Sequence, residues 1–283
     1  MKNMKIEKAE KLGLCFGVRR AIKLLKEAVH EYGRIETLGP LAHNRLLVEA
    51  LAKLGVRSID RLGQAEGRIL AITTHGVSPS VLAEINTGHI QLIDTTCPIV
   101  RKAQDAVKEL AEAGFNVFIF GDVNHSEVKG LLGWAGDKGI AALDLNQIYR
   151  SVKSPSRLGI VSQTTQTQSH FLRFAGQLMD MFGPNIDEIR LVNTLCKVTQ
   201  SQQEATLRLA RKSQLMIVIG GANSANTRHL VEICFPLVET HLIETADEVD
   251  ASWFVGKDHI GITAGASTPE EAVEELIDKL STL

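Results

Sequence analysis

Three cysteines stand at equivalent places in the chain, each after an apolar strand-like segment and before an amphipathic helix-like segment. Counting on from Cys15, Cys97 and Cys196, a glycine closes the next apolar segment after the same 24 residues in every case. A fixed spacing of this kind is an internal repeat. Polar side chains follow at equal offsets beyond these glycines: His43, His125 and Ser224, and then Arg45, Glu127 and Asn226. The repeat predicts three modules that face one shared site.

The cysteines differ in what their surroundings indicate. Cys234 lies among apolar residues, where a lone cysteine is usually an inert core residue. The other three precede helices, whose first amides favour the thiolate. Three converging thiolates suit a soft metal, and without a histidine at an equivalent fourth position zinc is one ligand short of a closed structural site. An iron–sulfur cluster held by three cysteines keeps one iron open for substrate, so the pattern favours a catalytic cluster.

The elements that position these residues alternate between short strands and helices. This order predicts parallel sheets whose functional loops gather beyond the carboxyl ends of the strands. A strand precedes Cys15, while the third module lacks its last strand. We therefore expect an α/β trefoil ring of three pseudo-equivalent modules with mainly parallel sheets around a central iron–sulfur site, with the chain ends near one another. The predicted modules are residues 1–97, including the N-terminal strand, 98–196 and 197–283.

Composition restricts the possible partners. A net charge of −2, a pI near 6.5 and no basic run longer than Arg19-Arg20 argue against nucleic acid. No apolar run reaches the roughly 18 residues of a membrane span, and residues 1–7 lack an apolar signal core. We expect a cytoplasmic protein with no membrane partner, whose cysteines stay reduced.

Eight motifs resemble, in order and over essentially the whole chain, those of the LytB family of 4-hydroxy-3-methylbut-2-enyl diphosphate reductases. They are Gly13–Val18, Gly39–Asn44, Thr74–Ser78, Thr95–Pro98, His125–Val128, Ser162–Thr165, Asn223–Asn226 and Thr263–Ser267. The resemblance implies an oxidoreductase with a [4Fe-4S] cluster bound by Cys15, Cys97 and Cys196. It also implies reduction of an allylic alcohol diphosphate to isopentenyl and dimethylallyl diphosphates, the last step of the non-mevalonate isoprenoid pathway.

Glu127 is the candidate proton donor, because a carboxyl group buried beside an anionic substrate keeps its proton near neutral pH. Thr164 resembles the family threonine that helps to relay this proton. The diphosphate needs hydrogen-bond donors, which we expect from all three modules. These donors are His43, His75, His125, Ser224, Asn226 and Ser267, with the backbone amide of Ala225. Thr199 either fixes the loop of Cys196 or caps a helix.

Two positions depart from the family pattern. Ala225 replaces a usual serine, which removes one hydroxyl donor worth about 0.5–1.5 kcal/mol. Ser126 replaces a usual proline. Neither change removes a cluster ligand or the proton donor, so the reaction stands and substrate affinity is the property they affect.

The electron source and two other classes of function stay open. Gly220-Gly221-Ala222 does not continue as a dinucleotide fingerprint, so the electrons come from outside, and the family uses ferredoxin or flavodoxin. A lyase that dehydrates at an open iron without net reduction would use the same residues. A non-catalytic redox sensor or a zinc-held scaffold would need the cysteines but not Glu127.

Overall fold

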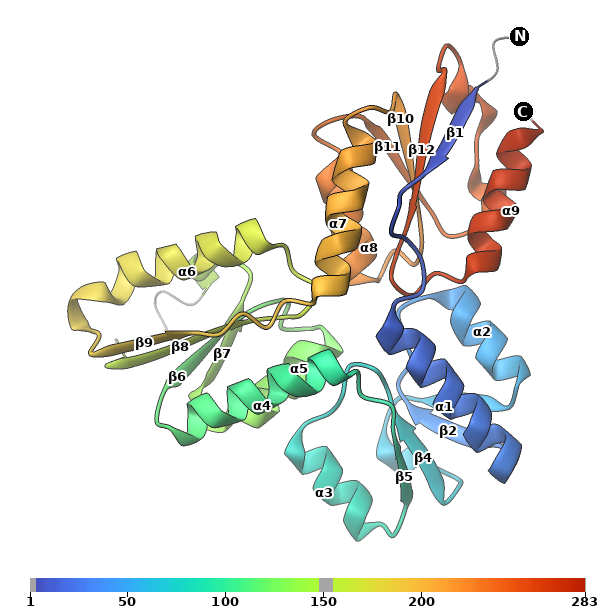
Figure 1. Cartoon of the computed structure of the whole chain (residues 1–283). Helices are drawn as coiled ribbons and strands as arrows, with labels where there is room; N and C mark the ends of the chain where they lie inside the picture. The colour runs from blue at the N-terminus through green and yellow to red at the C-terminus, as the bar shows by residue number, and fades with distance from the viewer. Residues whose placement is uncertain (1–3, 148–154, 283) are drawn as a thin grey trace.

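Short strands of the chain assemble into separate sheets. The computed structural model describes residues 4–147 and 155–282, and over these residues the strands form three four-stranded sheets in which every pair is parallel. Figure 1 shows the three sheets as the blades of a trefoil whose blades meet at a central hub. The predicted trefoil of parallel α/β modules is therefore confirmed.

Each module has the same set of elements. The first contains α1 (Phe16–Tyr32), β2 (Ile35–Leu38), α2 (Arg45–Lys53), β3 (Val56–Ile59), β4 (Ile69–Ile72), α3 (Pro79–Thr87) and β5 (Gln91–Asp94). The second contains α4 (Pro98–Glu112), β6 (Asn116–Phe120), α5 (Ser126–Ala135), β7 (Gly139–Ala142), β8 (Arg157–Ser162), α6 (Gln168–Phe182) and β9 (Glu188–Leu191). The third contains α7 (Lys197–Ala210), β10 (Leu215–Ile219), α8 (Ala225–Cys234), β11 (Glu239–Ile243), β12 (His259–Ala264) and α9 (Glu270–Ser281), and β1 (Lys5–Lys8) joins its sheet.

Helices cover both faces of each sheet because the middle strands are apolar on both sides. In the first module, Leu25 of α1 and Leu47 of α2 pack on one face, and Ile85 of α3 lies in the core on the other. The second module repeats this arrangement, with α4 and α5 on one face and α6 on the other. The cores lie within the modules, which leaves the hub to loops and polar side chains.

The N-terminal strand corrects the predicted module boundaries. The predicted first module, residues 1–97, includes this strand, but β1 pairs in parallel with β12 and completes the third sheet. The reason is topological, since each sheet takes its last strand from the segment just before a cysteine. The chain therefore passes from one module to the next at Cys15, Cys97 and Cys196, and β1 and α9 lie in the same blade (Figure 1).

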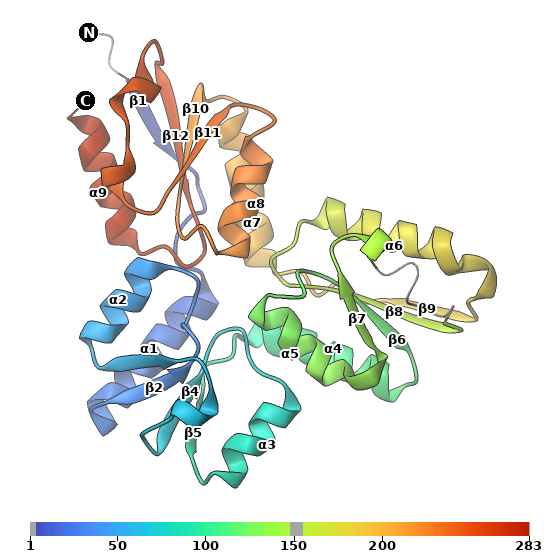
Figure 2. The same cartoon turned by 180° about the vertical axis from the view of Figure 1, so that it is seen from behind.

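The hub has two sides. The helices that follow the cysteines, α1, α4 and α7, lie toward the viewer in Figure 1, whereas α2, α5 and α8 lie toward the viewer from behind (Figure 2). The strand order explains this, because β5, β9 and β1 are edge strands of their sheets and β2, β6 and β10 lie two places further in. The cysteine loops and the loops of His43, His125 and Ser224 therefore occupy different levels of the hub.

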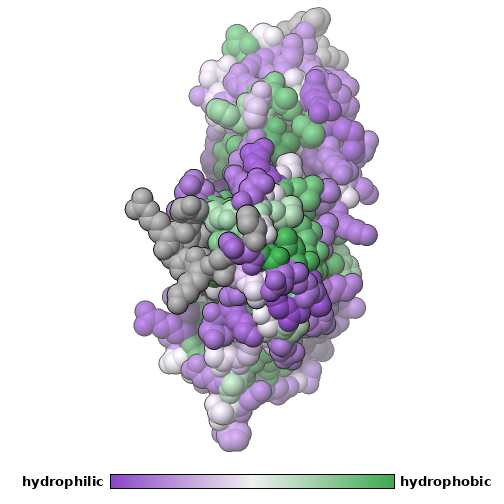
Figure 3. Space-filling view, turned by 90° about the vertical axis from the view of Figure 1, so that its left-hand side faces the viewer, coloured by the Kyte–Doolittle hydropathy of each residue, from purple (hydrophilic) through white to green (hydrophobic). Residues whose placement is uncertain are grey.

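The outer end of the second module mixes apolar and polar side chains. Leu172, Met179, Ile189 and Leu191 are exposed in this module. Figure 3 looks at this end of the molecule and shows a hydrophobic area framed by hydrophilic residues.

Among the described residues, no helix is both long enough and apolar enough to cross a lipid bilayer.

Candidate active site at the hub

The structure brings the three repeat cysteines to one central cavity. Cys15, Cys97 and Cys196 are half-buried free thiols at the starts of α1, α4 and α7, and all three line this cavity. A Cβ atom on Gly17 would lie 2.6 Å from Cys97 Sγ and 3.9 Å from Cys15 Sγ. Glycine at this position therefore leaves the room that a group bound by the sulfurs needs, and the residues fit a cluster held by three thiolates.

Burial changes the pKa of the cysteine thiols more than the amides at the helix starts do. Backbone amides of Gly17 and Val18 bond the Cys15 sulfur and lower its pKa, but burial raises the pKa of this thiol by more. The pKa of Cys97 is raised for the same reason. The helix amides thus favour the thiolate at both positions, as the sequence predicts, but burial outweighs them and the pKa of each thiol in the free protein is raised. Thiols in such a setting become charged when a metal binds them.

Three histidines form a compact cluster at the same cavity. The rings of His43, His75 and His125 have centroids 4.9–5.2 Å apart. Their ligand nitrogens lie within 4.8 Å of one another. Burial is the main effect that lowers the pKa of each ring, to about 4 for His125, so all three are neutral near pH 7. Neutral imidazoles at this spacing can bind a metal ion or donate N–H groups to an anion.

Hydrogen bonds at the helix starts decide what these side chains can donate. His125 Nδ1 accepts the backbone N–H of Glu127 at 3.2 Å, so the proton of the neutral ring is on Nε2. Ser224 Oγ likewise accepts the N–H of Thr227 at 3.3 Å, which leaves its O–H free to donate. Both residues thus cap a helix and keep a donor for a ligand.

Several buried polar atoms that line the cavity have no hydrogen-bond partner among the residues that the structure describes. They are His43 Nε2, Thr165 Oγ1, Asn226 Oδ1 and Ser267 Oγ. A buried polar group without a hydrogen bond costs about 1–3 kcal/mol. Such groups, gathered from all three modules, indicate a polar ligand that completes their bonding.

Glu127 and Thr164 form a buried pair. The backbone N–H of Thr164 donates to Glu127 Oε1 at 2.6 Å, and its hydroxyl group donates to Oε2 at 3.0 Å. These bonds lower the pKa of Glu127, but burial outweighs them and raises the pKa to about 7. Glu127 is 2% exposed and lines the cavity. It can therefore hold a proton at neutral pH and deliver it inside the cavity.

The cavity is lined by every residue that the sequence singled out as a candidate. They are Cys15, His43, His75, Cys97, His125, Glu127, Thr164, Cys196, Ser224, Ala225, Asn226 and Ser267. Arg45 shares their repeat spacing but is exposed and pairs with Glu49 and Glu244. Thr199 donates to the carbonyl oxygen of Cys196 at 2.9 Å, so it fixes the cysteine loop.

Sequence reasoning missed two contributors. Thr165 stands in a recognised motif, yet only the structure shows its hydroxyl group buried at the cavity without a partner. Gly17 also lies in a motif, but its proximity to Cys97 depends on two modules meeting. Cys234 has the predicted inert role, because it is fully buried in the third core and burial raises its pKa to about 12.

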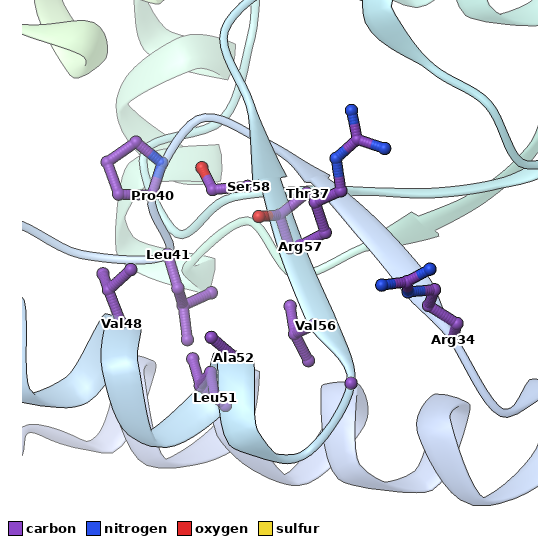
Figure 4. Close-up of a pocket in the computed structure, with 11 residues that line it drawn as sticks. Arg34, Thr37, Pro40, Leu41, Val48, Leu51, Ala52, Val56, Arg57 and Ser58 are labelled. Atoms are coloured by element: carbon purple, nitrogen blue, oxygen red, sulfur yellow. The ribbon is translucent and has the colours of Figure 1, made fainter.

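A second cavity lies away from the hub, on the first module (Figure 4). Its walls include Leu41, Leu51 and Val56, with Arg34 and Arg57 beside them. Arg57 pairs with Glu36 and Glu66. None of the predicted site residues lines this cavity, so the chemistry belongs to the hub.

The fold and the hub define a class: an enzyme of three α/β modules whose reactive groups meet where the modules join. The family described as "LytB protein" matches residues 6–281. A protein of Dehalococcoides mccartyi (strain CBDB1) named 4-hydroxy-3-methylbut-2-enyl diphosphate reductase is 45% identical over 280 residues, covering 99% of both chains. One of Pelobacter propionicus with the same name is 37% identical over 281 residues, again covering 99% of both. The chain belongs to the LytB family.

Two solved structures agree with this assignment. One, described as (E)-4-hydroxy-3-methyl-but-2-enyl diphosphate reductase, the terminal enzyme of the non-mevalonate pathway, is 36% identical with a TM-score of 0.72 and matches 99% of this chain and 100% of its own. The other, the E-1-hydroxy-2-methyl-but-2-enyl-4-diphosphate reductase from Plasmodium falciparum, is 27% identical with a TM-score of 0.92 and matches 99% of this chain and 88% of its own.

Proposed function

We propose that this protein reduces 4-hydroxy-3-methylbut-2-enyl diphosphate to isopentenyl diphosphate and dimethylallyl diphosphate, the last step of the non-mevalonate isoprenoid pathway. The names of its relatives support the substrate. The observation that carries the proposal is the meeting at one cavity of three free thiols, a buried carboxyl group and polar atoms from three modules that have no partner among the described residues.

Cys15, Cys97 and Cys196 are the residues that hold the cofactor, a [4Fe-4S] cluster. When bound there, the cluster supplies electrons and an open iron that polarises the hydroxyl oxygen of the substrate. The space beside Gly17 and the free state of the three thiols support this assignment.

The polar residues of the hub bind and orient the diphosphate. His125 donates its Nε2–H, because its Nδ1 atom already accepts the N–H of Glu127. Ser224 donates its hydroxyl proton, because a lone pair of its Oγ atom already accepts the N–H of Thr227. His43, His75, Asn226 and Ser267 complete the set, with the backbone amide of Ala225 at the start of α8. Fixing the diphosphate at this end of the cavity orients the allylic hydroxyl toward the cysteines.

Glu127 supplies the proton that the leaving hydroxyl group needs. The overall change is R–OH + 2e⁻ + 2H⁺ → R–H + H₂O, so one proton leaves in water and one ends on carbon. Thr164 holds both carboxyl oxygens of Glu127 and fixes the direction of the O–H bond. Burial keeps this carboxyl group protonated up to about pH 7, which suits a general acid.

The test is anaerobic purification with iron and sulfide counted, followed by turnover of the allylic diphosphate with dithionite-reduced viologen. We expect iron and sulfide together, and both products only when reductant is present. Product without any reductant would instead identify a lyase. Zinc without sulfide, or no product under any condition, would identify a scaffold or a sensor.

A further inference from the structure

The strand order places the cysteines on one outer level of the hub. In each sheet the strand before a cysteine is at the edge, and the next two strands lead to the other site residues. The neighbouring strands β12, β4 and β8 precede Ser267, His75 and Thr164, and the strands beyond them precede Ser224, His43 and His125. Because adjacent strands are about 4.8 Å apart, the sulfur level is separated from the deepest donors by about two strand spacings. Electrons can therefore reach the sulfurs from outside without crossing the polar part of the cavity.

Cys15 connects the inside of the hub to this outer surface. It lines the central cavity and also an outer cavity of about 410 Å³ between the first and third modules. The outer cavity is formed by the loop before α1 and the first turns of α1 and α7. At this place the cysteine level is open to a partner molecule.

Apolar side chains are exposed directly beside the cysteines. Phe16, which follows Cys15, is 63% exposed, and Val198, two residues after Cys196, is 40% exposed. Both line the outer cavity. An exposed aromatic side chain at a concave surface is typical of a protein interface.

Basic side chains surround these apolar residues. Lys11 and Lys197 line the outer cavity, and Arg19 is exposed one turn after Phe16, with its Nε atom bonded to the carbonyl oxygen of Leu14. The acidic residue that lines the cavity, Glu10, pairs with Arg208 at 2.8 Å. The surface therefore has a positive character around an apolar centre.

We propose that this surface, formed by Lys11, Phe16, Arg19, Lys197 and Val198 and called here the docking face, binds an acidic one-electron carrier protein. The inference rests on the proposed function, because a reductase without a flavin or nicotinamide site must receive its electrons from a partner. Each turnover oxidises two one-electron carriers and takes up two protons, and the oxygen leaves as water. Electron-transfer encounters use small interfaces and charge attraction, which this face provides.

The experiment compares two electron sources with the same cluster-loaded enzyme. The probe is an acidic ferredoxin, reduced by its reductase in one assay and replaced by reduced methyl viologen in the other. We expect Lys11→Glu with Lys197→Glu, made together, to lower kcat/KM for ferredoxin about ten-fold or more, because rim charges steer association. Phe16→Ala should lower it as well. The viologen-driven rate should stay within about two-fold of wild type, because a small reductant needs no protein interface.

Direct binding gives a second readout that does not depend on turnover. Surface plasmon resonance with oxidised ferredoxin should show weaker binding for the double variant at low salt, and little difference at high salt, where surface charges are screened. Lys53→Glu, in the last turn of α2 on the other side of the hub, is the matched control and should bind like wild type. Counts of iron and sulfide verify that each variant contains the cluster. If Lys197→Glu disturbs cluster loading, the single variant Lys11→Glu replaces the double variant in both measurements.

Two results distinguish the proposals. Equal ferredoxin affinity and equal ferredoxin-driven rates for wild type, the double variant and Phe16→Ala would overturn the docking face while leaving the reductase intact. Absence of viologen-driven turnover in the wild type would overturn the proposed function, and the binding data would still decide whether the face docks an acidic protein.

Discussion

Two opposing effects set the pKa of Glu127, and this pKa decides whether the carboxyl group can donate a proton. Burial favours the neutral carboxyl group, while two bonds from Thr164 favour the carboxylate, and the result is a pKa of about 7. Glu127→Gln keeps the shape but removes the acidic proton. We expect turnover with reduced viologen to fall by about 100-fold or more, as for loss of a general acid. Diphosphate affinity, measured by calorimetry, should change little. Wild-type turnover in this variant would falsify the assignment.

Thr164 tunes this acid through its hydroxyl group. The side-chain bond to Glu127 lowers the pKa, so Thr164→Val should raise it, while the backbone N–H bond remains. Because the acid acts in its protonated form, turnover in the wild type should decline as pH rises through about 7. In Thr164→Val this decline should move to higher pH, which a pH profile of kcat with viologen as donor measures. An unshifted profile would show that another group limits the rate.

The histidine cluster links anion binding to protons. Burial lowers the pKa of His43, so the ring is neutral in the free protein at pH 7, and a bound diphosphate would favour its charged form. His125 is less suited to gain a proton, because its Nδ1 atom already accepts the N–H of Glu127. We expect inorganic diphosphate to bind more tightly as pH falls from about 8 to 6, with proton uptake visible by calorimetry in two buffers. His43→Gln should flatten this dependence, and an equal slope in the variant would count against His43.

At the scale of elements, the start of α1 must leave room beside the sulfurs. A Cβ atom at Gly17 would lie 2.6 Å from Cys97 Sγ, closer than real contacts allow. Gly17 is the second residue of α1 and its backbone is not in the left-handed region, so Gly17→Ala should still fold but should lose iron and sulfide on reconstitution. Gly176→Ala in α6, where a Cβ would contact nothing within 4 Å, is the matched control and should load normally. Normal loading of Gly17→Ala would contradict the assigned site.

The sequence predicts the elements near the cysteines better than two of the strands at the opposite edges of the sheets, β3 and β11. The apolar spacing over 99–113 predicts a helix, and α4 spans Pro98–Glu112. Ser78 before Pro79 predicts a helix start, and Ser78 Oγ accepts the N–H of Val81 at the start of α3. The apolar pattern of the sequence does not indicate β3 and β11, because both strands are short and polar residues such as Arg57 and His241 interrupt them. The module of β1 was wrong for a related reason: a four-residue strand does not reveal which sheet it completes.

The sequence predicts which residues form the site, but not how deeply they are buried or how burial changes their pKa values. The repeat spacing and the motifs predict that these residues meet at one hub, but they give no distances between them. Burial cannot be read from spacing, so the raised pKa of Cys15 and the unpartnered hydroxyl group of Thr165 needed the structure. Both depend on how tightly the three modules close around the cavity.

At the scale of the whole molecule, each site cysteine lies where the chain leaves one module for the next. Polar contacts around the hub also join the blades, such as the bonds from Trp134 Nε1 to the carbonyl oxygen of Val77 and from Gln203 Nε2 to the carbonyl oxygen of Thr165. A group bound to all three sulfurs therefore ties all three modules to one another. Its binding should stabilise the entire chain, because a ligand that binds only the folded state adds its binding free energy to folding.

We expect the anaerobic loaded protein to unfold at a Tm higher than that of the apoprotein by about 5 °C or more, since about 1 kcal/mol shifts the Tm of a chain of this size by roughly 2–4 °C. Cys196→Ala should abolish the difference by removing one of the three connections. Cys234→Ala, which changes a buried core thiol outside the hub, should lower the Tm of both forms and keep the difference between them. Differential scanning calorimetry under argon measures all four values. If Cys196→Ala and Cys234→Ala retain the same loaded-minus-apo difference, the sulfur of Cys196 does not join the modules, and the hub would have to hold its cofactor in another way.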